Sequence, residues 1–80
     1  MEWEIGAVAE SLRGRDKGKR MCVVGTAEGF VLVCDGRERP LERPKRKNPK
    51  HLKRENKLLT AAQMRSNRAI KQALKFFSEA

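Results

Sequence analysis

Basic side chains gather in two stretches of the sequence, and cations packed this densely bind anions such as phosphate. The two stretches hold Arg13, Arg15, Lys17, Lys19 and Arg20, and then Arg43, Lys45, Arg46, Lys47, Lys50, Lys53 and Arg54. Arginine presents a planar fork that matches phosphate oxygens, and lysine presents a compact charge. The chemistry that this pattern favours is therefore the binding of a polyanion.

The first stretch contains two glycines, whose spacing predicts a tight, charged turn. Gly14 and Gly18 lack a Cβ, so the backbone between them can bend sharply and approach a ligand closely. Arg15 and Lys17 would project from the turn, while Asp16 would hydrogen-bond the backbone within it. A loop that is merely solvated is the alternative, but the density of charge favours contact with RNA.

The second stretch is spaced by prolines and contains no acid between residues 43 and 54. Pro40, Pro44 and Pro49 disfavour a helix and keep the chain extended, so its charges can follow a phosphate track at a lower entropic cost. The alternative is a flexible, solubilising linker. We expect the folded strands to bring both stretches to one side. The predicted RNA contacts are Arg13, Arg15, Lys17, Lys19, Arg43, Lys45, Arg46, Lys47, Lys50 and Lys53.

The other reactive residue types form neither a catalytic set nor a metal site. Cys22, Cys34 and His51 lack both the spacing and the fourth ligand of a zinc site, and no nucleophile has a base with a group to orient it. The thiols are expected to be reduced and buried, with a disulfide as the less favoured alternative. A chain of 80 residues also has little material for the walls of a deep pocket. The sequence predicts no enzyme, no cofactor and no metal.

Exposed aromatic rings, on which the bases of a single strand stack, are expected to be scarce. The aromatic residues are Trp3, Phe30, Phe76 and Phe77. Phe30 and Phe77 fall within apolar patterns and are expected in the core, and size alone favours the core for Trp3 and Phe76. Recognition is therefore expected to follow phosphates and shape, as for structured RNA.

The composition is that of a small globular domain with an anionic partner. Nineteen lysines and arginines stand against ten acids, which gives a net charge of +9 and a pI near 10.3. The hydrophobic fraction of 39% is too high for a wholly disordered chain. No run approaches the ~18 apolar residues of a membrane span, and the acidic N-terminus is unlike a secretory signal. We expect a cytoplasmic monomer that does not engage a membrane.

Short apolar runs separated by turn signals predict a small β-barrel in residues 1–55, followed by a helical tail in residues 56–80. The predicted strands cover residues 3–9, 21–24, 30–34, 37–41 and 51–53. Asp35-Gly36 is a strong signal for a type I′ hairpin turn, and the unbroken apolarity of residues 30–34 suggests burial on both faces. The predicted fold class is mostly β, a barrel of about five short strands.

The tail changes to a helical period. Apolar residues recur at spacings of three and four and predict a helix over residues 67–78. Thr60 with Gln63 fits a capping box, and Ser66 or Asn67 can act as a second cap. The helix packs either on the barrel or on a partner, and the barrel is favoured because short isolated helices are marginal in water.

Six segments together resemble the small bacterial KOW-domain RNA-binding proteins, which are similar to a large-subunit ribosomal protein of archaea and eukaryotes. The matching segments are residues 5–11, 14–19 (Gly-Arg-Asp-Lys-Gly-Lys), 22–25, 31–36, 42–52 and 65–74. The resemblance implies an SH3-like barrel that binds RNA, often ribosomal RNA, without catalytic activity. Related modules in transcription elongation factors also contact protein, so the fold alone does not fix the partner.

Two functions follow from the charge and the resemblance. The first is a non-catalytic RNA-binding module that is associated with the ribosome or its RNA, with ribosomal or other translation proteins as further partners. The second is an adaptor that binds an acidic protein surface of the transcription or translation machinery, where cations serve equally well. The first is the main prediction.

Overall fold

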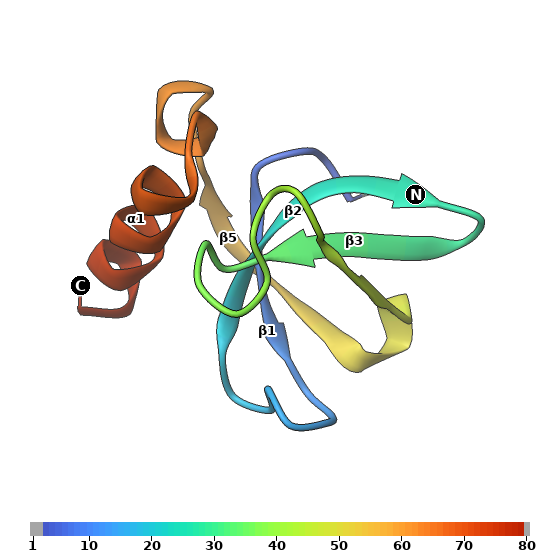
Figure 1. Ribbon diagram of the computed structural model, residues 1–80. Helices are drawn as coiled ribbons and strands as arrows, with labels where there is room; N and C mark the ends of the chain where they lie inside the picture. The colour runs from blue at the N-terminus through green and yellow to red at the C-terminus, as the bar shows by residue number, and fades with distance from the viewer. Residues whose placement is uncertain (1–2, 80) are drawn as a thin grey trace.

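The computed structural model describes residues 3–79, which form one curved antiparallel sheet and a C-terminal helix (Figure 1). The elements are β1 Ala7–Ser11, β2 Arg20–Ala27, β3 Phe30–Cys34, β4 Lys45–Lys47, η1 Pro49–His51, β5 Leu52–Leu58, η2 Ala62–Met64 and α1 Asn67–Glu79, where η is a 3₁₀ turn. The strand order is β4-β3-β2-β1-β5, and in the described residues the sheet curves without closing. The predicted mostly-β class with a helical tail is confirmed, while residues 1, 2 and 80 of the predicted segments lie outside the described range.

Alternating strand positions supply two separate cores, one on each face of the sheet. The inner core consists of Ala7, Ala9, Met21, Val23, Val31, Val33 and Leu52. The helix-side core consists of Val8, Cys22, Cys34, Leu59, Ile70, Ala73 and Leu74. Helix α1 therefore packs on the sheet. Within β3, Val31, Val33 and Cys34 are buried, Leu32 is half-buried and Phe30 is exposed, so the predicted burial on both faces is reached only at the end of the strand.

A glycine lets the helix approach the sheet closely. Gly36 has a φ of +76°, and a Cβ at this position would collide with the carbonyl oxygen of Asn67 at the start of α1. The Asn67 side-chain oxygen also accepts a hydrogen bond of 2.7 Å from the backbone N–H of Leu41. The segment after β3 is thus fastened to the first turn of the helix.

Two polar caps direct the chain after β5. The N–H of Thr60 donates to the side-chain oxygen of Gln63 at 2.9 Å, and the N–H of Gln63 donates to the Thr60 hydroxyl at 3.2 Å. The predicted capping box is confirmed, but it stands at the start of η2 rather than of a long helix. Ser66 caps α1 by accepting a hydrogen bond of 3.1 Å from the N–H of Ala69.

The type I′ turn predicted at Asp35-Gly36 is wrong. The tight turn lies between β2 and β3, at Glu28-Gly29, where both residues have the positive φ (54° and 84°) that this turn requires. Residues 37–41 do not form the predicted strand, because the Asp35 carboxylate accepts two backbone hydrogen bonds from that segment and holds it as a loop. On the side away from β2, β3 pairs with β4 instead.

The first and last strands also differ from prediction. β1 begins at Ala7 rather than residue 3, because Gly6 turns the chain at a φ of +99°. β5 extends to Leu58, well beyond the short strand predicted at residues 51–53 and past the expected boundary after residue 55. Its length follows from its pairing with β1, which runs from Ala7 opposite Leu58 to Ser11 opposite Leu52.

Candidate nucleic-acid interface

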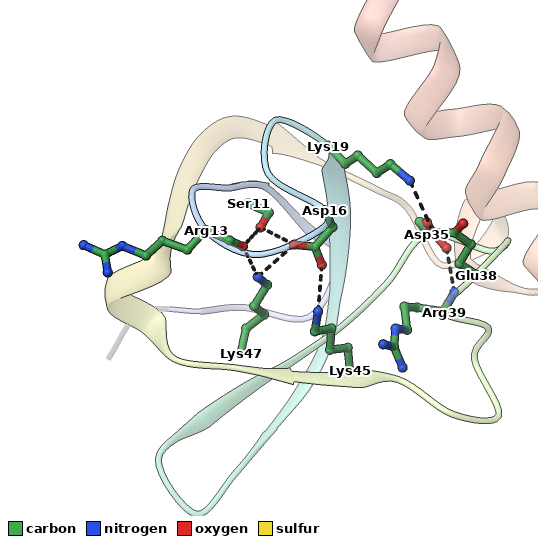
Figure 2. Close-up of polar contacts among 9 residues, drawn as sticks. All are labelled: Ser11, Arg13, Asp16, Lys19, Asp35, Glu38, Arg39, Lys45 and Lys47. Carbon is green, nitrogen blue, oxygen red and sulfur yellow. Dashed lines mark hydrogen bonds and ion pairs between the residues drawn. The ribbon is translucent and has the colours of Figure 1, made fainter.

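The loop between β1 and β2 is built around one buried carboxylate, that of Asp16 (Figure 2). Ser11 donates its hydroxyl proton to Asp16 Oδ1 at 2.6 Å. Lys47 Nζ donates to the same oxygen at 2.9 Å and to the carbonyl oxygen of Arg13 at 2.7 Å. Lys45 Nζ donates to Asp16 Oδ2 at 3.2 Å. These four side chains, Ser11, Asp16, Lys45 and Lys47, form the Asp16 cluster, which replaces the backbone hydrogen bonds expected of Asp16.

The Asp16 cluster buries charged groups, which must therefore be paired with other groups of the protein. The side chains of Asp16 and Lys47 are only 11% and 7% exposed. Burial would raise the pKa of Asp16, but hydrogen bonds from Ser11, Lys47 and Lys45 outweigh this and hold its pKa well below the usual range. Asp16 is therefore ionised at neutral pH and fixes the loop against β4.

The cluster brings the two basic stretches together, but it uses two of their lysines internally. Successive side chains of a strand point to opposite faces. Lys45 and Lys47 accordingly turn toward Asp16, while Arg46 between them is exposed. Lys47, predicted to contact RNA, instead has its ammonium group enclosed by the protein and anchors the loop.

The loop presents its remaining cations to solvent. Gly14 and Gly18 have φ values of 92° and 88°, and the N–H of Gly18 donates to the carbonyl oxygen of Ser11 at 2.8 Å, which makes the predicted tight turn. The exposed cations of the loop are Arg13, Arg15, Lys17 and Lys19. In Figure 2 the Arg13 side chain extends away from the cluster.

A hollow of about 360 Å³ separates this loop from the loop after β3. Its charged lining consists of Arg15, Lys19, Arg39 and Lys45, with Asp16, Asp35 and Glu38 as acids. Lys19 and Glu38 form an ion pair of 3.3 Å across the hollow (Figure 2), with side chains 51% and 75% exposed. Such an exposed pair contributes little stability, so a phosphate group can displace it at small cost.

Helix α1 extends the cationic surface with residues that the sequence analysis did not select. A second hollow, of about 280 Å³, shares Lys19 and Asp35 with the first and is lined by Arg20, Arg37, Lys71 and Lys75 as further cations. The two helix lysines are four residues apart and therefore lie on one side of α1. We call the exposed cations of the β1–β2 loop, together with those that line the two hollows, the cationic face: Arg13, Arg15, Lys17, Lys19, Arg37, Arg39, Lys71 and Lys75.

The other predicted contacts are exposed but lie in different surroundings. Lys50 belongs to η1, which adjoins the loop because the N–H of Leu12 donates to the carbonyl oxygen of His51 at 2.8 Å. Lys53 lies on β5 and Arg43 in the loop before β4. Arg46 contacts Glu28 and Phe30 near the β2–β3 turn. The structure therefore gathers part of the predicted set.

Two of the aromatic side chains are exposed, contrary to expectation. Phe30 is 38% and Phe76 66% exposed. Phe30 stands at the first position of β3, with the guanidinium of Arg46 over its ring, and Phe76 lies outside the apolar stripe of α1. Trp3 and Phe77 are partly buried against the inner core and the helix-side core.

The cysteines are buried free thiols that face each other across β2 and β3. Burial raises the pKa of Cys22 to about 12 and that of Cys34 to about 11, so neither is a thiolate at neutral pH. Within residues 3–79, no three His, Cys, Asp or Glu side chains are grouped closely enough to hold a metal ion.

Comparison with known proteins adds no family. In the described part of the chain, no helix has the length and apolarity needed to cross a membrane. No protein-family model matches the sequence, and a search of curated proteins finds no significant relative. The KOW resemblance therefore stays a prediction.

Proposed function

We propose that this protein is a non-catalytic RNA-binding module whose cationic face binds the phosphate backbone of structured RNA. The observation that carries the proposal is the β1–β2 loop, where four exposed cations project from a turn that a buried carboxylate holds in place. The KOW resemblance favours ribosomal RNA and a cytoplasmic monomer that associates with the ribosome. Ribosomal or other translation proteins would then be its neighbours.

The mechanism is electrostatic and preorganised. Because the Asp16 cluster fixes the loop before any ligand arrives, binding does not have to order the backbone that carries Arg15 and Lys17. Lysines and arginines that neutralise phosphates release condensed counterions, which makes affinity depend steeply on salt. The lysines of α1 widen the surface from a single loop to two elements.

The test is a salt titration with a structured RNA hairpin. If the face contacts about five phosphates, log K falls against log salt with a slope of roughly −3 to −5. Arg15→Ala should lower the affinity, whereas the matched control Arg65→Ala, an exposed arginine that lines neither cationic hollow, should not. Equal losses for the two variants would remove the loop from the interface.

Nuclease treatment of a cell lysate separates RNA binding from the adaptor function. Partners that disappear from a pull-down after nuclease are held through RNA, which supports the proposal. Partners that remain, and that are lost with Arg15→Ala, would show an acidic protein surface on the cationic face and overturn it.

A further inference from the structure

A third hollow, of a different character, lies at the β2–β3 hairpin and η1. Its volume is about 430 Å³, and its lining is Trp3, Thr26, Gly29, Phe30, Val31 and Pro49. Two aromatic side chains thus border one space: Trp3, which also packs on the inner core, and Phe30, which is 38% exposed. A Cβ added to Gly29 would meet no atom within 4 Å, so this side of the hollow is open.

Cations stand at the rim of this aromatic hollow. The guanidinium carbon of Arg46 lies 5.8 Å from the centroid of the Phe30 ring, within the range of a cation–π contact. Its ion pair with Glu28 is 3.5 Å long, and the two side chains are 58% and 77% exposed, so the pair is weak and a phosphate can replace it. Lys50, directly after Pro49, is also exposed.

We propose that the aromatic hollow binds one unpaired base of the RNA that occupies the cationic face, an inference that rests on the proposed function. Bases stack on exposed aromatic rings regardless of sequence, and arginine beside a ring adds to such contacts. An apolar peptide side chain would use the rings but would bring no anion to the rim cations. A nucleotide uses both, because its base meets the rings and its phosphate meets Arg46.

Both sites lie within the reach of a single stem-loop, because the molecule is only 26 Å along its longest axis. The paired stem would then lie on the cationic face while one loop base enters the hollow. The exposed Thr26 at the lining offers a hydroxyl for the edge of that base.

The fluorescence of Trp3 reports directly on binding at the aromatic hollow, because Trp3 is the only tryptophan of the chain. The probes are an RNA hairpin with an unpaired loop and a fully paired RNA duplex of equal length. The hairpin should bind about tenfold more tightly than the duplex and should quench Trp3 fluorescence, whereas the duplex should not. Phe30→Ala should abolish this preference and leave duplex binding unchanged.

A conservative variant separates stacking from packing. Phe30→Leu keeps an apolar side chain but removes the ring, and it should lose the hairpin preference as Phe30→Ala does. Circular dichroism of both variants should match that of the wild type, since Phe30 is partly exposed.

The outcomes distinguish this inference from the proposed function. If hairpin and duplex bind equally and Trp3 emission is unchanged, the hollow takes no base, while the RNA-binding function stands. If neither RNA binds, the proposed function fails and the inference falls with it. If an apolar peptide quenches Trp3 and the hairpin does not, the hollow is a protein site and the inference is overturned.

Discussion

The two basic stretches look alike in sequence but differ in the direction of their charges. In the β1–β2 loop, Arg15 and Lys17 are exposed, and the cations point to solvent. In β4, Lys47 is buried and Lys45 is held against Asp16, so that only Arg46 between them remains free of the cluster. The difference shows that a lysine serves as a ligand contact or as an anchor according to strand alternation and the position of one acid.

The acid that decides this lies in the opposite stretch. Asp16 is surrounded in sequence by bases, yet its carboxylate binds lysines that are about thirty residues further along the chain. A single buried carboxylate therefore gives part of a basic stretch a structural role in place of a binding role. Substitutions in the two groups of lysines should therefore have separate effects, one on stability and the other on binding.

Lys47→Ala should give the largest effect, on stability. The substitution removes one ion-pair partner of the buried Asp16 carboxylate, so the free energy of unfolding should fall by about 3 kcal/mol. Lys17→Ala, the matched control on the exposed loop, should change it by less than ~0.5 kcal/mol. Urea denaturation measures both, and equal effects would abolish the distinction between anchor and contact.

The double substitution Arg15→Ala/Lys17→Ala should show the opposite pattern. RNA affinity should fall by about 10- to 100-fold and the salt slope should flatten by roughly 1.5, because two phosphate contacts are lost. The urea midpoint should stay that of the wild type, since both side chains are exposed. A loss of stability comparable to that of Lys47→Ala would contradict the comparison.

Acid should weaken the anchor but not the exposed loop. The pKa of Asp16 is lower in the folded protein than the ~3.9 of an unfolded aspartate, so its stabilisation is complete above that pH and is lost as the pH falls below it. The loss from this one group is at most about 1.4 kcal/mol per pH unit. Urea denaturation of wild type and Asp16→Asn from pH 7 to pH 3 measures it, and the gap between them should narrow only below about pH 4.

Lys71→Ala/Lys75→Ala should have the smallest effect. These lysines line the second of the two cationic hollows, so their loss should weaken binding of the RNA hairpin about fivefold, with an unchanged urea midpoint. The control is Arg65→Ala/Gln72→Ala, because Arg65, just before α1, and Gln72, on α1, both line a different hollow. If the control matches the lysine variant, α1 has no specific place in the interface.

Short-range sequence patterns predicted the elements whose formation depends on neighbouring residues. The strand Phe30–Cys34 has its predicted limits and α1 begins at the predicted residue 67, because an apolar run and an amphipathic period are both short-range signals. The hairpin predicted at Asp35-Gly36 was wrong for a reason that is also local. The side chain of Asp35 competes for the backbone hydrogen bonds of the segment that follows it.

The candidate site was predictable only where its residues are adjacent in sequence. Arg15 and Lys17 follow from the glycine-bounded turn. The inward direction of Lys47 depends on Asp16, and the contribution of Lys71 depends on how closely α1 approaches Gly36. Both are contacts between distant segments, and residue types alone do not specify them.

The close contact between Gly36 and the start of α1 also couples the stability of the sheet to that of the helix. The sheet face that α1 covers carries Val8 and Cys22, which would be bare without the helix, so sheet and helix should unfold in a single cooperative transition. A nucleic acid that contacts both the β1–β2 loop and Lys71 would bind only the folded state, so it would stabilise the packing of α1 on the sheet by mass action. Ligand and fold would reinforce each other across an interface that depends on the absence of a single methyl group.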